Sequence, residues 1–423
     1  MLYGLADCNN FFVSCERVFN PSLEGRAVVV LSNNDGCVIS RSNEAKALGI
    51  PMGCPTFQIK DYTDPRQVVI ISANHVLYRD MSHRVMSVIG ETFDAIEIYS
   101  VDEAFFRLPY PDDDVRNREL AAAVVRKIFK YTGIPVSIGV ARSRTLAKIA
   151  SHMAKKDPTN KSRVQVLTDA SQIADVLSRT DLSDVWGIGR RLTVSLASRG
   201  IRTAAQFAAL PPSMVRSLFS VTVERTLMEL RGEDCQPVSP VTMARKSIMN
   251  SRTFPKVFYR REDVADAVLT FAEMCAKHLR DEHSVASTLT VYVRGDYHRE
   301  DLPFYSNSCK VRIPSPSSST MVLVHCAMQA LNSIFRRGYA YRKAGVMVTD
   351  LQPESGFQPS LFSQVDEQKH SKLMKAVDKI NNMAGAKVVK LAPQVSAEAA
   401  RPQRNYTAGR DEAIRFYSAP PKG

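Results

Sequence analysis

The sequence predicts an α+β protein in which two modules of strands and helices, each with one sheet, are separated by a helix-rich segment. The first observation is the order of elements up to residue 141, where strand and helix patterns follow one another as β, α, β, β, α, β. The second observation is that the same order returns between residues 245 and 350. This order is typical of a ferredoxin-like sheet built from split βαβ units, and residues 26–79 form an insertion in the first one.

Composition and charge narrow the class of protein. The length of 423 residues favours two to four domains, and the net charge of +13 favours a polyanionic partner, nucleic acid before an acidic membrane. No apolar run reaches the roughly 18–20 residues of a membrane helix, and we expect no signal peptide. The eight cysteines include no C-x-x-C pair, which predicts reduced thiols in a cytoplasmic protein rather than a zinc site or disulfides.

The first unit opens with a strand at residues 2–6, which leads directly into Asp7. Phe11 and Phe12 follow closely, and they pack in a core or form the floor of a pocket. Beyond the insertion, periodicity predicts a helix, a hairpin, a second helix and a final strand, at residues 81–92, 96–105, 119–131 and 136–141.

The insertion is expected to be a small subdomain. A β-branched run at residues 27–31 predicts a buried strand, an Asp-Gly turn and a return strand follow, and a helix is expected at 43–48. Ser40, Arg41 and Lys46 cluster where the return strand meets this helix. Such joints bind anions, so a triphosphate would fit here, although a solvated turn is the simpler interpretation.

The carboxylates of Asp102 and Glu103 are expected at or near the tip of the 96–105 hairpin. If this hairpin lies beside the first strand, both carboxylates converge with Asp7, and three carboxylates cannot all stay ionised there without cations. Hard oxygen ligands favour Mg²⁺, and two such ions form the clamp used for in-line phosphoryl transfer. The alternative is a solvated turn, because adjacent side chains on a regular strand point to opposite faces.

The segment at residues 166–238 consists of short helical pieces. Within it, Gly187-Ile188-Gly189 precedes Arg190 and Arg191 and resembles the turn of a helix-hairpin-helix. Glycines allow backbone N–H groups to approach a DNA phosphate closely, and the next helix N-terminus adds a favourable dipole. Contacts of this kind hold a duplex without reading its sequence.

The second unit, at residues 243–351, carries no group of acids like that of the first. Its strands and strand ends are instead basic, through Arg245, Lys246, Arg252, Lys310, Arg312, Arg342 and Lys343. A basic sheet face of this kind would bind DNA phosphates non-specifically. The last segment, residues 352–423, loses periodicity and is expected to be a partly disordered tail that folds on partners.

These motifs together resemble the Y-family translesion DNA polymerases. The resemblance is carried, in order, by Asp7 with the phenylalanine pair, by Ser100–Phe105, by the Ala147–Ala150 helix and by Gly187–Gly189, over roughly residues 1–350. Within the family, Leu31–Ile39 and Asn43–Gly49 are similar to the UmuC-type catalytic subunit of DNA polymerase V, whether chromosomal or plasmid-borne. No single motif is specific, but the combination is.

The resemblance implies a domain organisation and an activity. It places a palm at residues 1–25 and 80–165, fingers at 26–79, a thumb at 166–238, a little finger at 243–351 and the partner-binding tail at 352–423. The implied activity is template-directed, error-prone translesion synthesis in the SOS response, by two-metal transfer of a nucleotide from dNTP to a primer 3′-OH.

The resemblance also implies the metal ligands. Asp7 and Asp102 would bridge two Mg²⁺ ions, Glu103 would complete the ion that activates the primer 3′-OH, and the Cys8 carbonyl would be a further ligand.

Substrate contacts follow in the same way. Ser40, Lys46 and Lys155 fall where the family grips the triphosphate, and Arg41 substitutes for a Tyr that many members have where this chain has Asn43. Phe12 occupies the steric-gate position, five residues after the first acid, and Phe11 is the alternative.

Partners are implied by the tail. Gln358, Leu361 and Phe362, in Gln-Pro-Ser-Leu-Phe, match the peptide that docks on the bacterial sliding clamp. The rest of the tail is where UmuC-type proteins bind the processed UmuD-type dimer, and RecA is a further implied partner. Primer–template DNA and dNTP are the implied substrates.

Three other functions fit parts of the sequence. A non-catalytic DNA-bound scaffold would not need the three acids that this chain retains. A nucleotidyl cyclase shares the sheet and two metals, but the sequence has no Gly-Gly-Asp-Glu-Phe signature. A structure-specific nuclease can combine acids with a DNA-binding hairpin, and a dNTP-dependent product would distinguish a polymerase from it.

Overall fold

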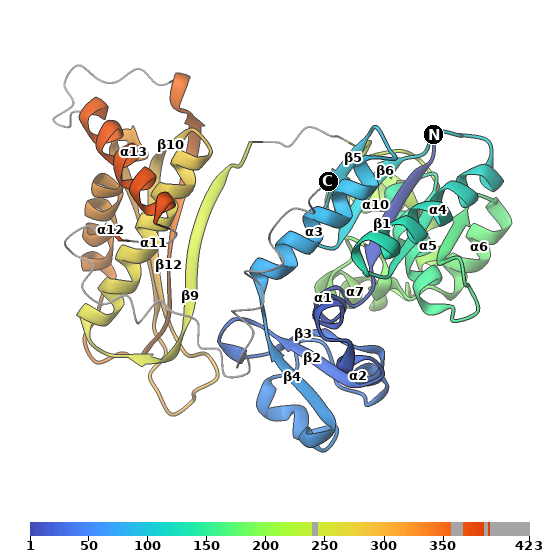
Figure 1. The fold of residues 1–423 in the computed structure, drawn as a ribbon, viewed down its shortest axis with the longest axis horizontal. Coiled ribbons are helices and arrows are strands. Elements are labelled where there is room, and N and C mark those ends of the chain that lie inside the picture. The colour runs from blue at the N-terminus through green and yellow to red at the C-terminus, as the bar shows by residue number, and fades with distance from the viewer. Residues whose placement is uncertain (239–243, 357–366, 385–387, 390–423) are drawn as a thin grey trace. The chain divides into compact units, whose positions relative to one another are not determined.

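The computed structural model describes residues 1–238, 244–356, 367–384 and 388–389. The chain divides into two compact units, residues 1–242 and 243–404, which are described separately here (Figure 1). Within the described residues, no helix is both long enough and apolar enough to span a bilayer.

The first unit contains a five-stranded sheet with strand order β5-β6-β1-β7-β8. Its first four strands have the predicted split βαβ arrangement, because β6 lies between β5 and β1 while β1 lies between β6 and β7. The fifth strand, β8, pairs parallel to β7 and was not predicted. The strands are β1 (Tyr3–Cys8), β5 (Ile96–Ile98), β6 (Glu103–Arg107), β7 (Val136–Ala141) and β8 (Val164–Leu167).

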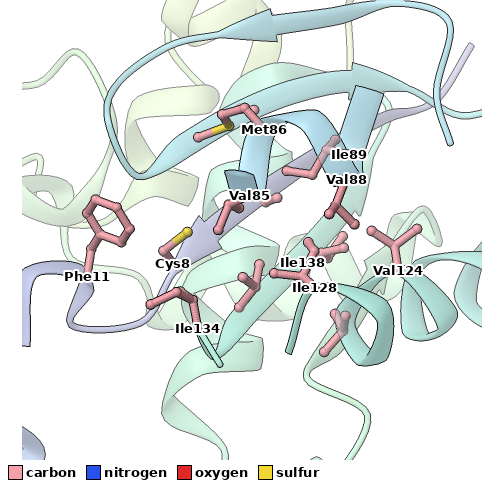
Figure 2. Packing of buried hydrophobic residues seen from close by; sticks show 14 of the residues in the cluster. Cys8, Phe11, Val85, Met86, Val88, Ile89, Val124, Ile128, Ile134 and Ile138 are labelled. Carbon is pink, nitrogen blue, oxygen red and sulfur yellow. The ribbon is translucent and has the colours of Figure 1, made fainter. Parts of the chain in front are cut away.

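Helices cover both faces of this sheet. On one face, α3 (His75–Gly90) and α4 (Asp114–Thr132) enclose the main core, and Figure 2 shows their aliphatic side chains beside Cys8. On the other face lies α5 (Arg144–Lys156), which approaches β7 very closely. A Cβ at Gly139 would lie 2.1 Å from the backbone nitrogen of Ser151, so this approach requires glycine.

The insertion forms its own three-stranded sheet, with order β3-β2-β4. The strands β2 (Ala27–Leu31) and β3 (Val38–Arg41) pair antiparallel, and α2 (Asn43–Ala47) follows β3 as the sequence indicates. The third strand, β4 (Val68–Ser72), runs parallel to β2 and was not predicted. The remaining elements here are α1 (Phe11–Phe19), which precedes the insertion, and the 3₁₀ turns η1 (Pro21–Leu23), η2 (Asn33–Asp35), η3 (Thr56–Asp61) and η4 (Pro65–Gln67).

The helical segment packs on α5 through a shared core that includes Leu146, Ala150, Leu196, Phe207 and Leu227. Its elements are α6 (Ala170–Arg179), η5 (Leu182–Asp184), α7 (Arg190–Ala197), α8 (Ala204–Ala208), α9 (Pro212–Leu218) and α10 (Val221–Leu230). The element just before the Gly-Ile-Gly turn is therefore a three-residue 3₁₀ turn, where the sequence suggested an α-helix.

The second unit contains a four-stranded antiparallel sheet with order β11-β10-β12-β9. The helices α11 (Arg261–Asp281) and α12 (Thr320–Ile334) pack on one face of this sheet (Figure 1). The predicted order of elements is confirmed, as β9 (Ser247–Phe258), α11 (Arg261–Asp281), β10 (Ser284–Gly295), β11 (Ser306–Ser317), α12 (Thr320–Ile334) and β12 (Tyr341–Pro353).

A short 3₁₀ turn, η6 (Glu354–Gly356), and a helix, α13 (Glu367–Met383), lie in the segment that was expected to be a partly disordered tail. The side chain of Met374 is 1% exposed, and Arg280 of α11 forms a two-pronged ion pair with Asp378 at 2.6 and 2.9 Å. The sequence interpretation missed this helix because the segment is rich in Ala, Gln, Pro and Lys, although Met374 and Val377 have helical spacing.

Candidate active site

The three predicted acids lie together at one end of two neighbouring inner strands of the first sheet, where β1 ends and β6 begins. Asp7 at the end of β1 is the cross-strand partner of Glu103, the first residue of β6, so both side chains share a face. Asp102 precedes β6 directly, and its carbonyl oxygen accepts the N–H of Cys8 at 2.9 Å. The hydroxyl of Ser100 donates to the Asp102 carboxylate at 2.6 Å and accepts the N–H of Glu103 at 3.0 Å. Ser100 therefore makes the bend that brings adjacent acids to one edge.

Two lysines of α5 hold two of these acids. Lys155 Nζ lies 2.9 Å from Asp7 Oδ1, and Lys148 Nζ lies 2.9 and 3.0 Å from the two oxygens of Glu103. The lysines are seven residues apart, which is about two turns, so they share one face of the helix. Lys155 had been assigned to the triphosphate, and Lys148 had been given no role. The sequence did not reveal their pairing because it joins residues far apart in the chain.

The donor set fits a hard divalent cation in its chemistry. Within the ranges that the structure describes, no group of three or more His, Cys, Asp or Glu side chains is arranged to hold a metal ion, and Asp7 and Glu103 face ammonium groups instead. All three acids are nevertheless carboxylates, which Mg²⁺ prefers. Burial raises the pKa of Glu103 even though Lys148 opposes this, so its ionised form needs a nearby cation.

The Cys8 thiol has a different environment. Cys8 is buried, and burial together with the neighbouring Asp7 and Asp102 carboxylates raises the pKa of the thiol well above its ordinary value. A neutral thiol is a poor metal ligand, so only the backbone carbonyl of Cys8 is a candidate.

Cations gather on the insertion side of the acids. Burial, and then the charges of Lys155 and Arg41, lower the pKa of Lys46, so three cationic side chains act on one region. Lys46 Nζ donates to the side-chain oxygen of Asn10 at 2.6 Å, and Asn10 in turn donates to Asn43 at 3.0 Å. Such a cluster is relieved by an anion, which agrees with the predicted phosphate contacts.

Two further predicted substrate-binding residues, Arg41 and Ser40, already form hydrogen bonds within the protein. Arg41 donates to the carbonyl of Ile50 at 2.5 Å, and its buried Nε has no partner. Ser40 is buried and accepts the N–H of Val13 at 3.4 Å, which ties β3 to α1.

Phe11 and Phe12 lie in different environments. Phe11 is 3% exposed and belongs to the main core (Figure 2). Phe12 is half-buried and stacks on the Tyr78 ring, with centroids 4.4 Å apart. Tyr78 is fixed by its hydroxyl, which donates to Glu16 at 2.8 Å. Phe12 thus has a rigid support and an accessible surface, and Phe11 has no free face.

A cavity of about 920 Å³ lies beside α5 and reaches the acids. Its lining includes Asp7, Glu103, Lys148 and Lys156 and, from the helical segment, Trp186. Asp7 and Glu103 therefore border a space large enough for part of a nucleic-acid chain. Trp186 is a lining residue that the sequence interpretation had not singled out.

The Gly-Ile-Gly turn has the backbone that its sequence suggests. Gly187 has a φ of +88°, which favours glycine, and a Cβ there would lie 2.9 Å from Thr226 Oγ1. Gly189 is the N-cap of α7, with no side chain over the helix N-terminus. Arg190 and Arg191 are exposed beside it, so backbone N–H groups and two guanidinium groups face solvent together.

The second unit has a basic open face. In β10 and β12, alternate residues such as Val293 and Ala344 face the helices, which leaves Arg294 and Lys343 on the opposite face. Four cations share that face: Arg294, Lys310, Arg312 and Lys343. Of these, Arg294 was not predicted, and four predicted cations lie elsewhere. Arg252 pairs in register with buried Ala344, Arg245 forms an ion pair with Glu282, Arg342 forms one with Asp296, and Lys246 is exposed just before β9.

Comparison with known proteins places the chain in a family. A model described as the impB/mucB/samB family matches residues 6–152, and its C-terminal domain model matches residues 245–361. Protein ImpB of Salmonella typhimurium is 38% identical over 389 residues, which cover 92% of each chain. The chain belongs to the impB/mucB/samB family of Y-family DNA polymerases. Protein UmuC of Salmonella typhimurium strain LT2 is 37% identical over 402 residues, 93% of each chain.

A solved structure agrees with this fold. The Y-family chimera of Dbh and Dpo4 superposes with a TM-score of 0.66, covering 84% of this chain and 100% of that chain at 22% identity. The predicted fold class and the UmuC-type resemblance are therefore confirmed. The polymerase is a DNA-directed DNA polymerase of the translesion class, and dependence on a divalent metal ion is general in its family.

Proposed function

We propose that Asp7, Asp102 and Glu103 are the catalytic acids of this polymerase and that they act with two Mg²⁺ ions. The observation that carries the proposal is the register of Asp7 with Glu103, with Asp102 beside them. These three carboxylates and the Cys8 carbonyl would hold the ions, which when bound lower the pKa of the primer 3′-OH and stabilise the leaving pyrophosphate.

The surrounding residues bind and orient the substrates. Lys46, Arg41 and Lys155 supply positive charge for the triphosphate, with Ser40 beside them. Phe12, held against Tyr78, abuts the sugar and excludes a ribose hydroxyl. Gly187, Gly189, Arg190 and Arg191 hold phosphates of the primer–template duplex, and the basic open face of the second unit adds sequence-independent contacts.

Low fidelity follows from the size of the fingers. The insertion consists of a three-stranded sheet, a five-residue helix and short 3₁₀ turns, which offer little surface to press on a nascent base pair. A loose pocket discriminates poorly by shape, so lesions and mismatches are tolerated. We place this error-prone synthesis in the SOS response.

The partner assignments are part of the proposal. The sliding clamp would bind Gln358, Leu361 and Phe362, which lie outside the described residues, and the tail would bind the processed UmuD-type dimer, with RecA as a further partner. A cytoplasmic location is proposed on the same basis, and all eight cysteines are free thiols.

The test is primer extension across an abasic site with Mg²⁺, dNTPs and the clamp, with the UmuD-type dimer and RecA added. Asp102→Ala should reduce synthesis by roughly a hundredfold or more, because a bound metal ion contributes several kcal/mol to catalysis. Binding of primer–template DNA should stay nearly unchanged. Asp112→Ala, an exposed acid of the same unit, is the matched control. Retained synthesis in Asp102→Ala would refute the assignment.

The alternative is a DNA-bound scaffold without chemistry. It predicts tight binding of primer–template DNA by the wild type and no dNTP-dependent product under any of these conditions.

A further inference from the structure

The ammonium group of Lys148 lies between a carboxylate and two aromatic rings. On one side it contacts both oxygens of Glu103, and on the other it lies 4.7 Å from the Tyr99 ring centroid and 5.2 Å from that of Trp186. The Lys148 and Glu103 side chains are 18% and 19% exposed. Lys148 therefore has two kinds of partner, and its own side chain is mostly buried.

The two rings come from different parts of the first unit and are fixed to each other. The Trp186 Nε1–H donates to the Tyr99 hydroxyl at 3.2 Å, and the rings meet edge to face at 5.5 Å. The backbone N–H of Tyr99 donates to the carbonyl of Glu103 at 3.0 Å, which holds this ring beside the acidic turn. Trp186 directly precedes Gly187, so the DNA-binding turn and the acid edge share one aromatic contact.

A second cation near Trp186 is already occupied. Arg144 lies 5.7 Å from the Trp186 ring, but both of its terminal nitrogens bond to Glu97, and its guanidinium lies 4.2 Å over Phe105. Among the described residues, Lys148 is the cation that links these rings to an acid proposed to bind metal.

Use of Glu103 as a metal ligand has a consequence for Lys148. Both Glu103 oxygens accept from Lys148, so a cation that takes either oxygen weakens that ion pair. An ammonium group with so little exposure is costly without a partner. The faces of Tyr and Trp rings attract ammonium groups, most strongly when water is excluded.

We propose that Tyr99 and Trp186 form an aromatic seat for Lys148, which positions the ammonium beside Glu103 and keeps it partnered when Glu103 binds a metal ion. The proposal rests on the proposed metal role of Glu103. Tyr99 and Trp186 are positioning residues, because they touch Lys148 and not the reacting atoms. Through Trp186, the turn that grips DNA also sets the environment of a catalytic acid.

The first test uses the fluorescence of Trp186, the single tryptophan of the chain. The full-length polymerase is titrated with Mg²⁺, and separately with Ca²⁺, without DNA. Wild type should show a saturating change, because the ammonium moves relative to the ring. Lys148→Met should abolish the change, and Lys156→Met, from the same helix and cavity, should retain it. A flat wild-type signal, or a full response in Lys148→Met, overturns the seat.

The second test separates the ring from its packing. Trp186→Leu should raise the Mg²⁺ concentration for half-maximal primer extension by roughly three- to tenfold, because it removes the ring face. Trp186→Phe keeps a ring face and should stay within about twofold of wild type. Thermal unfolding is measured for both variants. Equal Mg²⁺ requirements in the two variants, or shifts that follow only their unfolding temperatures, overturn the seat.

Failure of the seat differs from failure of the proposed function. If Asp102→Ala keeps synthesis, the acids are not catalytic and the proposed function is wrong. If Asp102→Ala is inactive while the wild-type fluorescence does not change with Mg²⁺, the catalytic role of the acids is supported. Only the proposed aromatic seat for Lys148 is then wrong.

Discussion

The two sheets of this polymerase share one order of elements but use it differently. In the first sheet, β1 is the central strand, between β6 and β7, and helices cover both faces. In the second sheet, β10 and β12 are the central pair, and α11 and α12 share one face. Because both faces of the first sheet are covered, its reactive side chains lie where strands end, as Asp7 and Glu103 do. The second sheet leaves one whole face uncovered by α11 and α12, and its cations are spread over that face.

This difference between the two sheets shows that the shared order of elements does not determine function. A βαββαβ order predicts two split βαβ crossovers in either sheet, but the acids or bases that follow each strand decide what the sheet does. Close packing on both faces also makes the first sheet more sensitive to added volume, which the following variants test.

Gly139→Ala against Gly345→Ala gives the largest expected difference in stability. A Cβ at Gly139 would meet backbone atoms of Ser151 and Ala147 at 2.1 and 2.2 Å, whereas one at Gly345 would meet side-chain atoms, the Tyr292 ring at 2.5 Å and the Ser251 Cβ at 2.6 Å. Backbone cannot yield as a side chain can, so we expect losses of about 3 kcal/mol or more and about 1 kcal/mol, respectively. Denaturant unfolding measures both, with Trp186 fluorescence reporting the first unit. Equal losses would contradict the contrast.

The same contrast explains how far the sequence alone could reach. Alternation and β-branched runs predicted the strands that hold Asp7 and Glu103, because those signals are local. The contact of Lys148 with Glu103 spans 45 residues, and that of Trp186 with Tyr99 spans 87. No local period encodes such contacts. The strand β4 was missed although Val-Val-Ile-Ile is a β-branched run like that of β2, and β8 is only four residues long, which makes its pattern weak.

Removing charge from the open face should weaken binding but not chemistry. The double variant Lys310→Ala/Arg312→Ala should weaken DNA binding by roughly tenfold at moderate salt and reduce the salt slope of binding by about two, since each phosphate contact contributes about 0.9. The control Arg260→Ala/Lys277→Ala removes one charge from the N-cap of α11 and one from the helix itself, in the helix layer. The rate from the bound complex should not change. If the control weakens binding equally, DNA does not use the open face.

The accessible ring of Phe12 should control the selection of deoxyribonucleotides over ribonucleotides. Phe12→Ala should increase ribonucleotide incorporation relative to deoxynucleotide by roughly tenfold or more, because a cavity then admits the 2′-hydroxyl. Phe11→Ala should instead destabilise the core, from which that ring cannot reach a substrate. Competitive incorporation assays and unfolding curves measure the two effects. A selectivity change in Phe11→Ala alone would move the gate by one residue.

The smallest expected effect concerns a buried carboxyl beneath α5. Glu229 is 0% exposed, accepts the N–H and hydroxyl of Thr145, and has one oxygen without a partner. Burial raises the pKa of Glu229 although Thr145 lowers it. A raised pKa means that the folded chain binds the proton more tightly, so this contribution is complete at low pH and is lost as pH rises through the raised value.

Glu229→Gln removes that titration, so the test is the difference between two stability curves. The free energy of unfolding of wild type relative to Glu229→Gln should fall as pH rises through the raised pKa of Glu229, because the folded chain then loses the proton that it binds more tightly than the unfolded chain does. Glu229 and Thr145 both belong to the first unit. The unfolding transition of the second unit should therefore not differ between wild type and Glu229→Gln. A difference that is constant with pH would mean that water or a neighbour already compensates the buried charge.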